Sequence, residues 1–149
     1  MLNNKLSEVH GLGCQDYTIA VYIANKPPLI EYQTLKELSA LSTGEISAIG
    51  QQCGNGWRKV FNIYAKLLFA FDKEPFAFAK QAPTWQQYRD STLLQKNSNT
   101  ALLFTAPIIE QEAKTIHLIT GRTYAKALVN SKKLSVKLTW LDEEFATNT

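Results

Sequence analysis

Residues 115–129 read TIHLITGRTYAKALV, and this stretch decides the fold that we expect. Residues 115–120 are mostly apolar and β-branched, which is typical of a strand buried on both faces of a sheet. Gly121 then breaks the run. The next apolar residues recur at helical spacing: Tyr124, Ala125, Leu128 and Val129. The stretch therefore predicts a strand, a tight turn and a helix.

The turn between that strand and helix carries the groups of an anion site. Thr120 and Thr123 offer hydroxyls, Arg122 offers a guanidinium, and Gly121 leaves backbone N–H groups accessible. Open α/β sheets bind ligands at the carboxyl ends of their strands, where this turn lies. The same residues also suit a plain junction in which Arg122 pairs with a nearby carboxylate, and both interpretations stay open.

Three further segments have the pattern of strands. Residues 17–24 (YTIAVYIA) are aromatic and β-branched and end at residues 25–28 (NKPP), which neither a helix nor a central strand can continue. Residues 101–105 form a second apolar run. Residues 134–140 alternate apolar and polar side chains, which indicates a strand with one face in water at an edge of the sheet.

Helices are expected between the first two strands. Residues 34–37 (TLKE) and 42–45 (STGE) both have the capping-box pattern that begins a helix, and Gly54 suits the end of the second helix. Residues 57–71 carry apolar side chains at helical spacing along one face. Residues 84–87 (TWQQ) repeat the capping pattern and predict one more helix.

The order of these elements predicts an α/β protein, built as a three-layer α/β/α sandwich. Its sheet has four mostly parallel strands, with a helical insertion after the first strand. Pro107 could begin a short crossover helix between the second and third strands. Alternatively, Ile108 and Ile109 could extend the second strand into an antiparallel hairpin with the third.

Length and composition are those of one globular domain over residues 1–149, with an irregular N-terminal arm at 1–15 and a flexible acidic tail at 142–149. The hydrophobic share is 45% and the charged share 19%, so extensive disorder is not expected. The net charge of +3 does not by itself indicate a nucleic-acid-binding protein. Every formal charge in residues 114–137 is nevertheless positive, which suits either a solvated face or an anion-binding one.

The cysteines and the chain's apolar runs suggest a cytoplasmic, soluble protein. Cys14 and Cys53 lack the spacing of a disulfide framework or a zinc site, so we expect reduced thiols. The N-terminal residues do not have the pattern of a signal peptide, and no apolar run reaches the ~20 residues that span a membrane.

The main candidate ligand site is the carboxyl edge of the predicted sheet, where turns from separate strands would meet. The residues expected there to bind a ligand are Asn25, Lys26, Thr120, Gly121, Arg122 and Thr123, with Thr105 and Trp140 near them. A second candidate anion site comprises Gly54, Asn55, Gly56, Arg58 and Lys59. That segment also suits a helix stop followed by a helix start.

Catalytic groups are harder to assign. His117 lies mid-strand, where a hydrogen-bonded core histidine is the simpler interpretation than a catalytic base. Asp142 and Glu143 are weak candidates for a general base, since they also suit a solvated tail. Trp85, Tyr88 and Trp140 could stack on bases if exposed. Because the sequence contains neither a P-loop nor a GxGxxG motif nor a metal-ligand cluster, we expect neither a cofactor nor a metal.

Three segments resemble the uracil-DNA glycosylase superfamily: TIHLITGRTYAKAL, ALLFTAPII and GWRKVFNIYAKLL. The resemblance implies the fold and an inherited pocket for a base or nucleotide. Two motifs of that family are not matched. Residues 25–28 (NKPP) lack the acid of its Gln-Asp-Pro-Tyr type loop, and residues 139–142 (TWLD) replace its His-Pro-Ser loop. Glycosylase chemistry is therefore not implied.

Three functional hypotheses remain. The first is binding of a nucleotide, a nucleic acid or another phosphorylated ligand at the carboxyl edge of the sheet. The second is a divergent hydrolase of glycosidic or phosphoester bonds, with Asp142 or Glu143 as the base. The third is an interaction module, such as a homodimer formed through the final strand.

Overall fold

Strand β2 (Ile19–Tyr22) lies at the centre of the hydrogen-bonded sheet. The computed structural model describes residues 9–71, 77–79, 82–107, 115–120, 139–140 and 145–147. In it β2 pairs in parallel with β4 (Thr100–Leu103) on one side and with β5 (Ile116–Thr120) on the other. The three predicted inner strands are thereby confirmed. The hairpin alternative is wrong, because β4 and β5 are both parallel to β2 and are separated by it.

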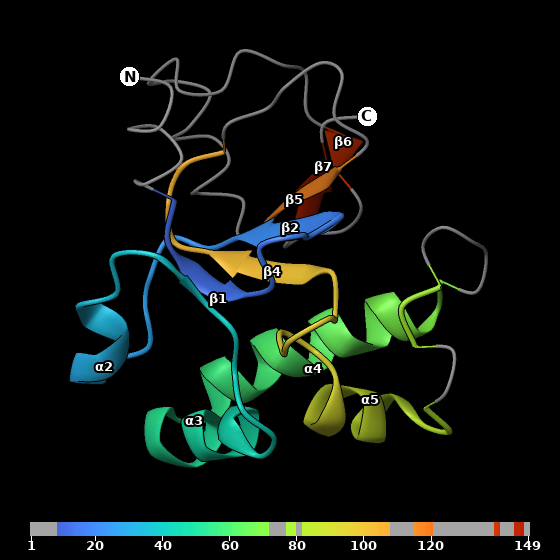
Figure 1. Cartoon of the computed structure of the whole chain (residues 1–149), viewed down its shortest axis with the longest axis horizontal. Coiled ribbons are helices and arrows are strands. Elements are labelled where there is room, and N and C mark those ends of the chain that lie inside the picture. The colour runs from blue at the N-terminus through green and yellow to red at the C-terminus, as the bar shows by residue number, and fades with distance from the viewer. Residues whose placement is uncertain are drawn as a thin grey trace.

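The sheet is larger and more mixed than predicted. The seven strands that the structure describes follow the order β3-β1-β4-β2-β5-β7-β6, and Figure 1 labels all of them except β3. The additional strands are β1 (Gly11–Gly13), β3 (Leu38–Ser39) and β7 (Phe145–Thr147), while β6 (Thr139–Trp140) falls in the predicted edge strand. Strands β1 and β4, β5 and β7, and β6 and β7 pair antiparallel. The α/β class is confirmed, whereas the number of strands is not.

Two of the extra strands lie in segments that the sequence suggested were irregular. Gly11–Gly13 belongs to the predicted arm, yet it pairs with β4 and with β3. Glycine has low β-propensity, but here a side chain would clash: a Cβ on Gly11 would lie 2.2 Å from the carbonyl oxygen of Leu102. Phe145–Thr147 belongs to the predicted flexible tail, yet it pairs with β5. Its three residues are too few to show a strand period.

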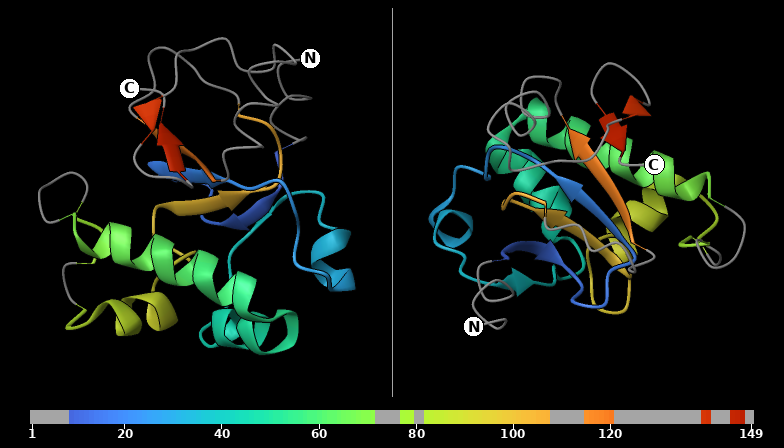
Figure 2. Two further views of the ribbon diagram at one scale, coloured as in Figure 1. Left: turned by 180° about the vertical axis from the view of Figure 1, so that it is seen from behind. Right: turned by 90° about the horizontal axis from the view of Figure 1, so that it is seen from above.

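The larger helices form one layer beneath the sheet, with α2 (Ile30–Gln33) at its side (Figures 1 and 2). That layer contains α3 (Glu45–Cys53), α4 (Asn55–Phe69) and α5 (Trp85–Ser91). The apolar face of α4 packs against the sheet, as predicted, and its buried residues are Phe61, Tyr64, Ala65 and Leu68. The predicted helix at 122–130, which would begin a layer on the other face, lies outside the described residues.

The capping patterns had different outcomes. Thr84 accepts a hydrogen bond from the backbone N–H of Gln87 and caps α5, as its pattern predicts. In the 42–45 pattern Glu45 accepts a hydrogen bond from the backbone N–H of Ser42, but the N-cap of α3 is Gly44, without a side-chain cap, and the helix begins at Glu45. Thr34 instead ends α2, because its hydroxyl donates to the carbonyl of Ile30. The helix predicted from residue 34 is therefore wrong, and the chain continues into β3.

Of the helices that the structure describes, none combines the length and the apolar character needed to cross a bilayer.

Replacing Gly11 by Ala tests the packing of β1. Because the added Cβ would meet the backbone of β4, we expect the free energy of unfolding to fall by about 2 kcal/mol or more, the cost typical of overpacking. Gly56→Ala is the matched control. Its Cβ would meet nothing within 4 Å, and Ala favours the helix by up to about 1 kcal/mol. Denaturant unfolding of both variants measures the difference, and equal stabilities would contradict this account of β1.

Candidate functional site

The carboxyl ends of β2, β4 and β5 share one edge of the sheet, as predicted for parallel strands. The hydroxyl of Thr120 donates to the carbonyl of Tyr22 at 3.0 Å and so joins the ends of β5 and β2. Asn25 is exposed in the loop after β2, and Nζ of Lys26 donates to the carbonyl of Gln33. Three of the predicted ligand-binding residues thus lie in or beside this edge.

Other predicted residues of the edge are only partly described. Thr105 follows β4, and its buried hydroxyl has no hydrogen-bond partner in the part of the chain that the structure describes. Trp140 closes β6, which runs in the same direction as β5 because both are antiparallel to β7. Gly121, Arg122 and Thr123 lie outside the described residues, as do Asp142 and Glu143. Their assignments remain predictions.

The second predicted anion site is built around the junction of α3 and α4. Gly54 has φ of +95°, ends α3 and precedes α4, which confirms the helix stop and start. Asn55 and Gly56 form the first turn of α4. One guanidinium nitrogen of Arg58 donates to the side-chain oxygen of Asn55 at 2.8 Å. The simpler interpretation of this segment is therefore correct, but it also sets the position of Arg58.

Gly50 allows Arg58 to lie against α3. A Cβ on Gly50 would come within 2.8 Å of Cγ of Arg58, so a larger residue there would displace the arginine. Lys59 is exposed on α4 and is not part of the cavity that Arg58 lines. The five predicted residues therefore contribute one side chain to this cavity, that of Arg58.

Arg58 and Arg89 line one cavity of about 270 Å³, which we call the arginine cleft. Its walls come from all three helices of the layer, and its other lining residues are Ile46, Ser47, Gly50, Gln51, Phe61 and Asn62. Arg89 is not among the residues predicted from the sequence, because only the packing of α5 against α4 places it at this cavity. No local pattern around residue 89 indicates that placement.

Arg89 is held from three sides. Its guanidinium donates to both carboxylate oxygens of Asp90, at 2.8 and 3.1 Å, and to the side-chain oxygen of Asn62 at 2.7 Å. It also lies over the ring of Trp85, with Cζ 5.3 Å from the ring centroid. These contacts use three of its five N–H groups and orient the rest. Among the described residues, no carboxylate forms an ion pair with Arg58.

The comparison with family models matches residues 10–149 to a family of unknown function, DUF6942. The chain belongs to the DUF6942 family. No curated protein and no solved structure matches it. The resemblance to the uracil-DNA glycosylases therefore remains a prediction for this DUF6942 member.

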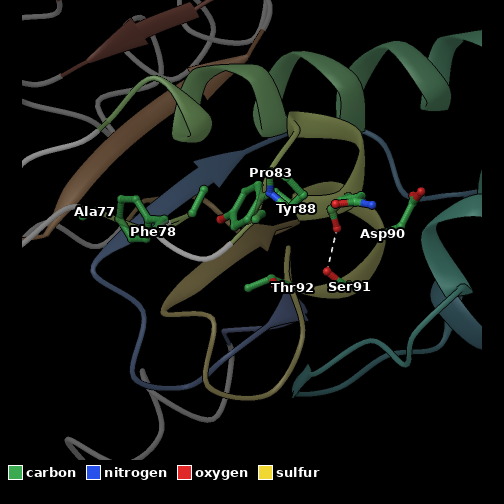
Figure 3. A pocket seen from close by; sticks show the side chains of 10 residues that line it. Ala77, Phe78, Pro83, Tyr88, Asp90, Ser91 and Thr92 are labelled. Atoms are coloured by element: carbon green, nitrogen blue, oxygen red, sulfur yellow. Dashed lines mark hydrogen bonds between the residues drawn. The ribbon is translucent and has the colours of Figure 1, made fainter.

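A second cavity of the DUF6942 chain, of about 700 Å³, lies beside α5 (Figure 3). Its lining combines apolar residues of the preceding segment with polar residues of α5: Ala77, Phe78, Ala79, Ala82, Pro83, Gln87, Tyr88, Asp90, Ser91 and Thr92. Tyr88, one of these lining residues, is fully buried; its hydroxyl has no partner among the described residues, and burial raises its pKa. It is thus a core residue and offers no surface for stacking on bases.

Trp85 is also not an exposed residue that could stack on a base, which was the condition for the role suggested by the sequence. Its side chain is half-buried, and Nζ of Lys66 lies 4.8 Å from its ring centroid in addition to Arg89. The ring therefore holds two cations in place instead of presenting an open face. The structure describes Trp140 only as part of β6, so its proposed stacking role stays a prediction.

His117 is a hydrogen-bonded core residue, as predicted. Its Nδ1 lies 2.7 Å from the hydroxyl oxygen of Tyr22, the two rings stack with centroids 5.7 Å apart, and only 5% of the residue is exposed. Burial lowers the pKa of His117 from its ordinary value of 6.5. Cys14 and Cys53 are free thiols, also as predicted, and the described residues include no cluster of potential metal ligands.

The buried His117 predicts a pH dependence of stability. In the unfolded chain this histidine takes up a proton as the pH falls through about 6.5, whereas the folded protein resists that proton. The free energy of unfolding should therefore fall as the pH drops below about 6.5, by at most about 1.4 kcal/mol per pH unit for this one group. Denaturant unfolding at several pH values measures the slope. His117→Gln should flatten it, and an unchanged slope in that variant would assign the effect to other groups.

Proposed function

We propose that the protein binds a phosphorylated ligand, with the phosphoryl group in the arginine cleft. The observation that carries the proposal is the convergence of Arg58 and Arg89 on one cavity whose lining, among the described residues, contains no carboxylate; Asp90 pairs with Arg89 but is not one of the lining residues. Guanidinium groups bind phosphate oxygens through pairs of hydrogen bonds, and such charge-assisted bonds are about twice as strong as neutral ones.

The two arginines would contribute differently. Arg89 is already oriented by Asp90, Asn62 and Trp85, so little side-chain entropy would be lost when it binds an anion. Asp90 offsets part of its charge. Arg58 has a single described hydrogen bond, to Asn55, and supplies the larger share of uncompensated positive charge.

The volume of the cleft favours recognition of one group of a larger ligand. About 270 Å³ is just below the ~300–1,000 Å³ typical of sites that enclose a whole small molecule. A phosphoryl group would fit with a small part of its attached body, and the remainder would extend into solvent. This supports a nucleotide, a nucleic acid or another phosphorylated molecule, without distinguishing them. We place the binding in the cytoplasm, consistent with the free thiols of Cys14 and Cys53.

The carboxyl edge of the sheet remains an alternative position for the same ligand class. Asn25, Lys26 and Thr120 lie in or beside that edge, but the hydroxyl of Thr120 and the ammonium of Lys26 are already hydrogen-bonded to backbone carbonyls. Arg122 is the cation that the sequence predicts there. Replacing Arg122 and Arg58 separately therefore distinguishes the two positions.

Hydrolysis is not favoured by a described contact, because its proposed bases, Asp142 and Glu143, lie outside the described residues. If turnover of a phosphoester or glycosidic substrate is detected, retention in both Asp142→Asn and Glu143→Gln would exclude these bases.

One observation favours dimerisation as a second candidate function. Strand β6 comes last in the order of the described strands, so a second copy could extend the sheet from it. Light scattering that finds only monomer at high protein concentration would exclude this dimer.

Arg58→Ala is the direct test of the proposed function. The free energy of unfolding of the variant should lie within about 0.5 kcal/mol of the wild-type value, because Arg58 lies on the surface and makes one side-chain hydrogen bond within the described part of the chain. Its affinity for pyrophosphate or a nucleoside monophosphate should fall by about tenfold or more, the value of one charged hydrogen bond. Titration calorimetry at low salt measures this.

Two further variants complete that test. Lys36→Ala, at an exposed position of the loop before β3, removes the same charge elsewhere and should bind like the wild type. A loss of affinity in Arg122→Ala, with none in Arg58→Ala, would move the site to the carboxyl edge.

A further inference from the structure

From the arginine cleft, a row of side chains continues along the contact between α4 and α5. Arg58, Asn62 and Lys66 lie one helical turn apart on α4, at positions i, i+4 and i+8. On α5, Arg89 contacts Asn62 and Trp85 contacts Lys66. The two helices therefore run antiparallel at this contact, and their facing side chains form a continuous row. We call this row the basic groove: Arg58, Asn62, Lys66, Trp85 and Arg89.

The basic groove carries more positive charge than its surroundings compensate. Helix α4 contributes Arg58 and Lys66 to the groove and contains no acidic residue. On α5 the one acid is Asp90, which pairs with Arg89. On α3 the one acid is Glu45, and its carboxylate is hydrogen-bonded to the hydroxyl of Tyr32 and the backbone of Ser42. Within the described residues, no carboxylate forms an ion pair with Lys66.

We propose that the basic groove binds the sugar-phosphate backbone of a single-stranded nucleic acid. This inference rests on the proposed function, because one phosphate would occupy the arginine cleft. The row from Arg58 to Lys66 covers eight helical steps, or about 12 Å, which is too long for one phosphoryl group and suits successive phosphates of an extended strand. A single small phosphorylated ligand would leave Lys66 without a role.

The arrangement of Trp85 indicates how the strand is recognised. Its ring is occupied by Lys66 and Arg89, so it positions cations for phosphates and is not an open platform for a base. Recognition through phosphates carries no direct sequence information. Binding is therefore independent of base sequence.

A membrane surface is less consistent with this groove. Peripheral binding to anionic lipid combines cations with apolar side chains that enter the bilayer. The large hydrophobic side chain exposed among the described residues is Ile30, which lies on α2 and not in the basic groove. The groove thus offers charge without an apolar anchor.

The test measures fluorescence anisotropy of labelled oligothymidylate and oligouridylate of about 12 nucleotides, titrated with the full chain. Three phosphate contacts predict that log K falls with log salt concentration with a slope of about −2 between about 50 and 200 mM salt. Lys66→Gln should weaken binding severalfold and reduce the slope to about −1.4, because one contact is lost. Lys66→Arg should restore both. Lys36→Gln is the charge-matched control and should change neither.

The outcomes separate the two proposals. If pyrophosphate binding depends on Arg58, while oligonucleotide affinity and slope do not change in Lys66→Gln, the groove is overturned and the proposed function stands. If Arg58→Ala changes the affinity for neither pyrophosphate nor the oligonucleotides, both proposals are wrong. The last experiment measures binding to vesicles that contain phosphatidylserine. Binding to them that is as tight as binding to the oligonucleotides, and equally dependent on Lys66, would overturn the choice of nucleic acid.

Discussion

The structure depends on the complete burial of β2. All four of its residues are buried, so every backbone N–H and C=O of this strand needs a partner inside the protein. The parallel strands β4 and β5 supply these partners on either side. The pairing continues at the strand ends, where Ile23 donates to Leu103 and Thr18 donates to Asn99. Burying so apolar a segment is favourable only because its backbone is fully paired.

The helix layer is positioned by a second buried polar group. The hydroxyl of Tyr64 on α4 is buried and donates to the carbonyl of Ala101 in β4 at 2.9 Å. This hydrogen bond requires α4 to lie close under the sheet with one particular rotation. With that face turned to the core, Arg58, Asn62 and Lys66 lie on the side that meets α5. The proposed anion site is therefore a consequence of how α4 is fixed to the sheet.

The positive charge of the cleft arises because its two arginines are compensated to different extents. Asp90 and Asn62 hold Arg89 in place and partly compensate it, whereas Arg58 is compensated by no described carboxylate. A site with one oriented arginine and one uncompensated arginine is both ordered and attractive to an anion. The net charge of +3 gives no hint of this, because electrostatic potential depends on local arrangement.

Local patterns determined much of the fold from the sequence alone. The β-branched runs predicted β2, β4 and β5 because buried central strands need apolar side chains on both faces. The helical spacing predicted α4, and the capping patterns of residues 84–87 and 42–45 predicted α5 and α3. His117 was also assigned correctly to the core. All these signals act within a few residues of the chain.

Tertiary structure alone decided the rest. Gly11–Gly13 is a strand because it pairs with β4, whose backbone leaves no room for a side chain at Gly11 or Gly13, and the three-residue β7 forms because β5 offers it an edge. The cleft depends on Arg58 and Arg89, which are 31 positions apart in the sequence, lining one cavity through the packing of α5 on α4. Such contacts depend on the summed burial of both helices, so no pattern local to either arginine encodes them.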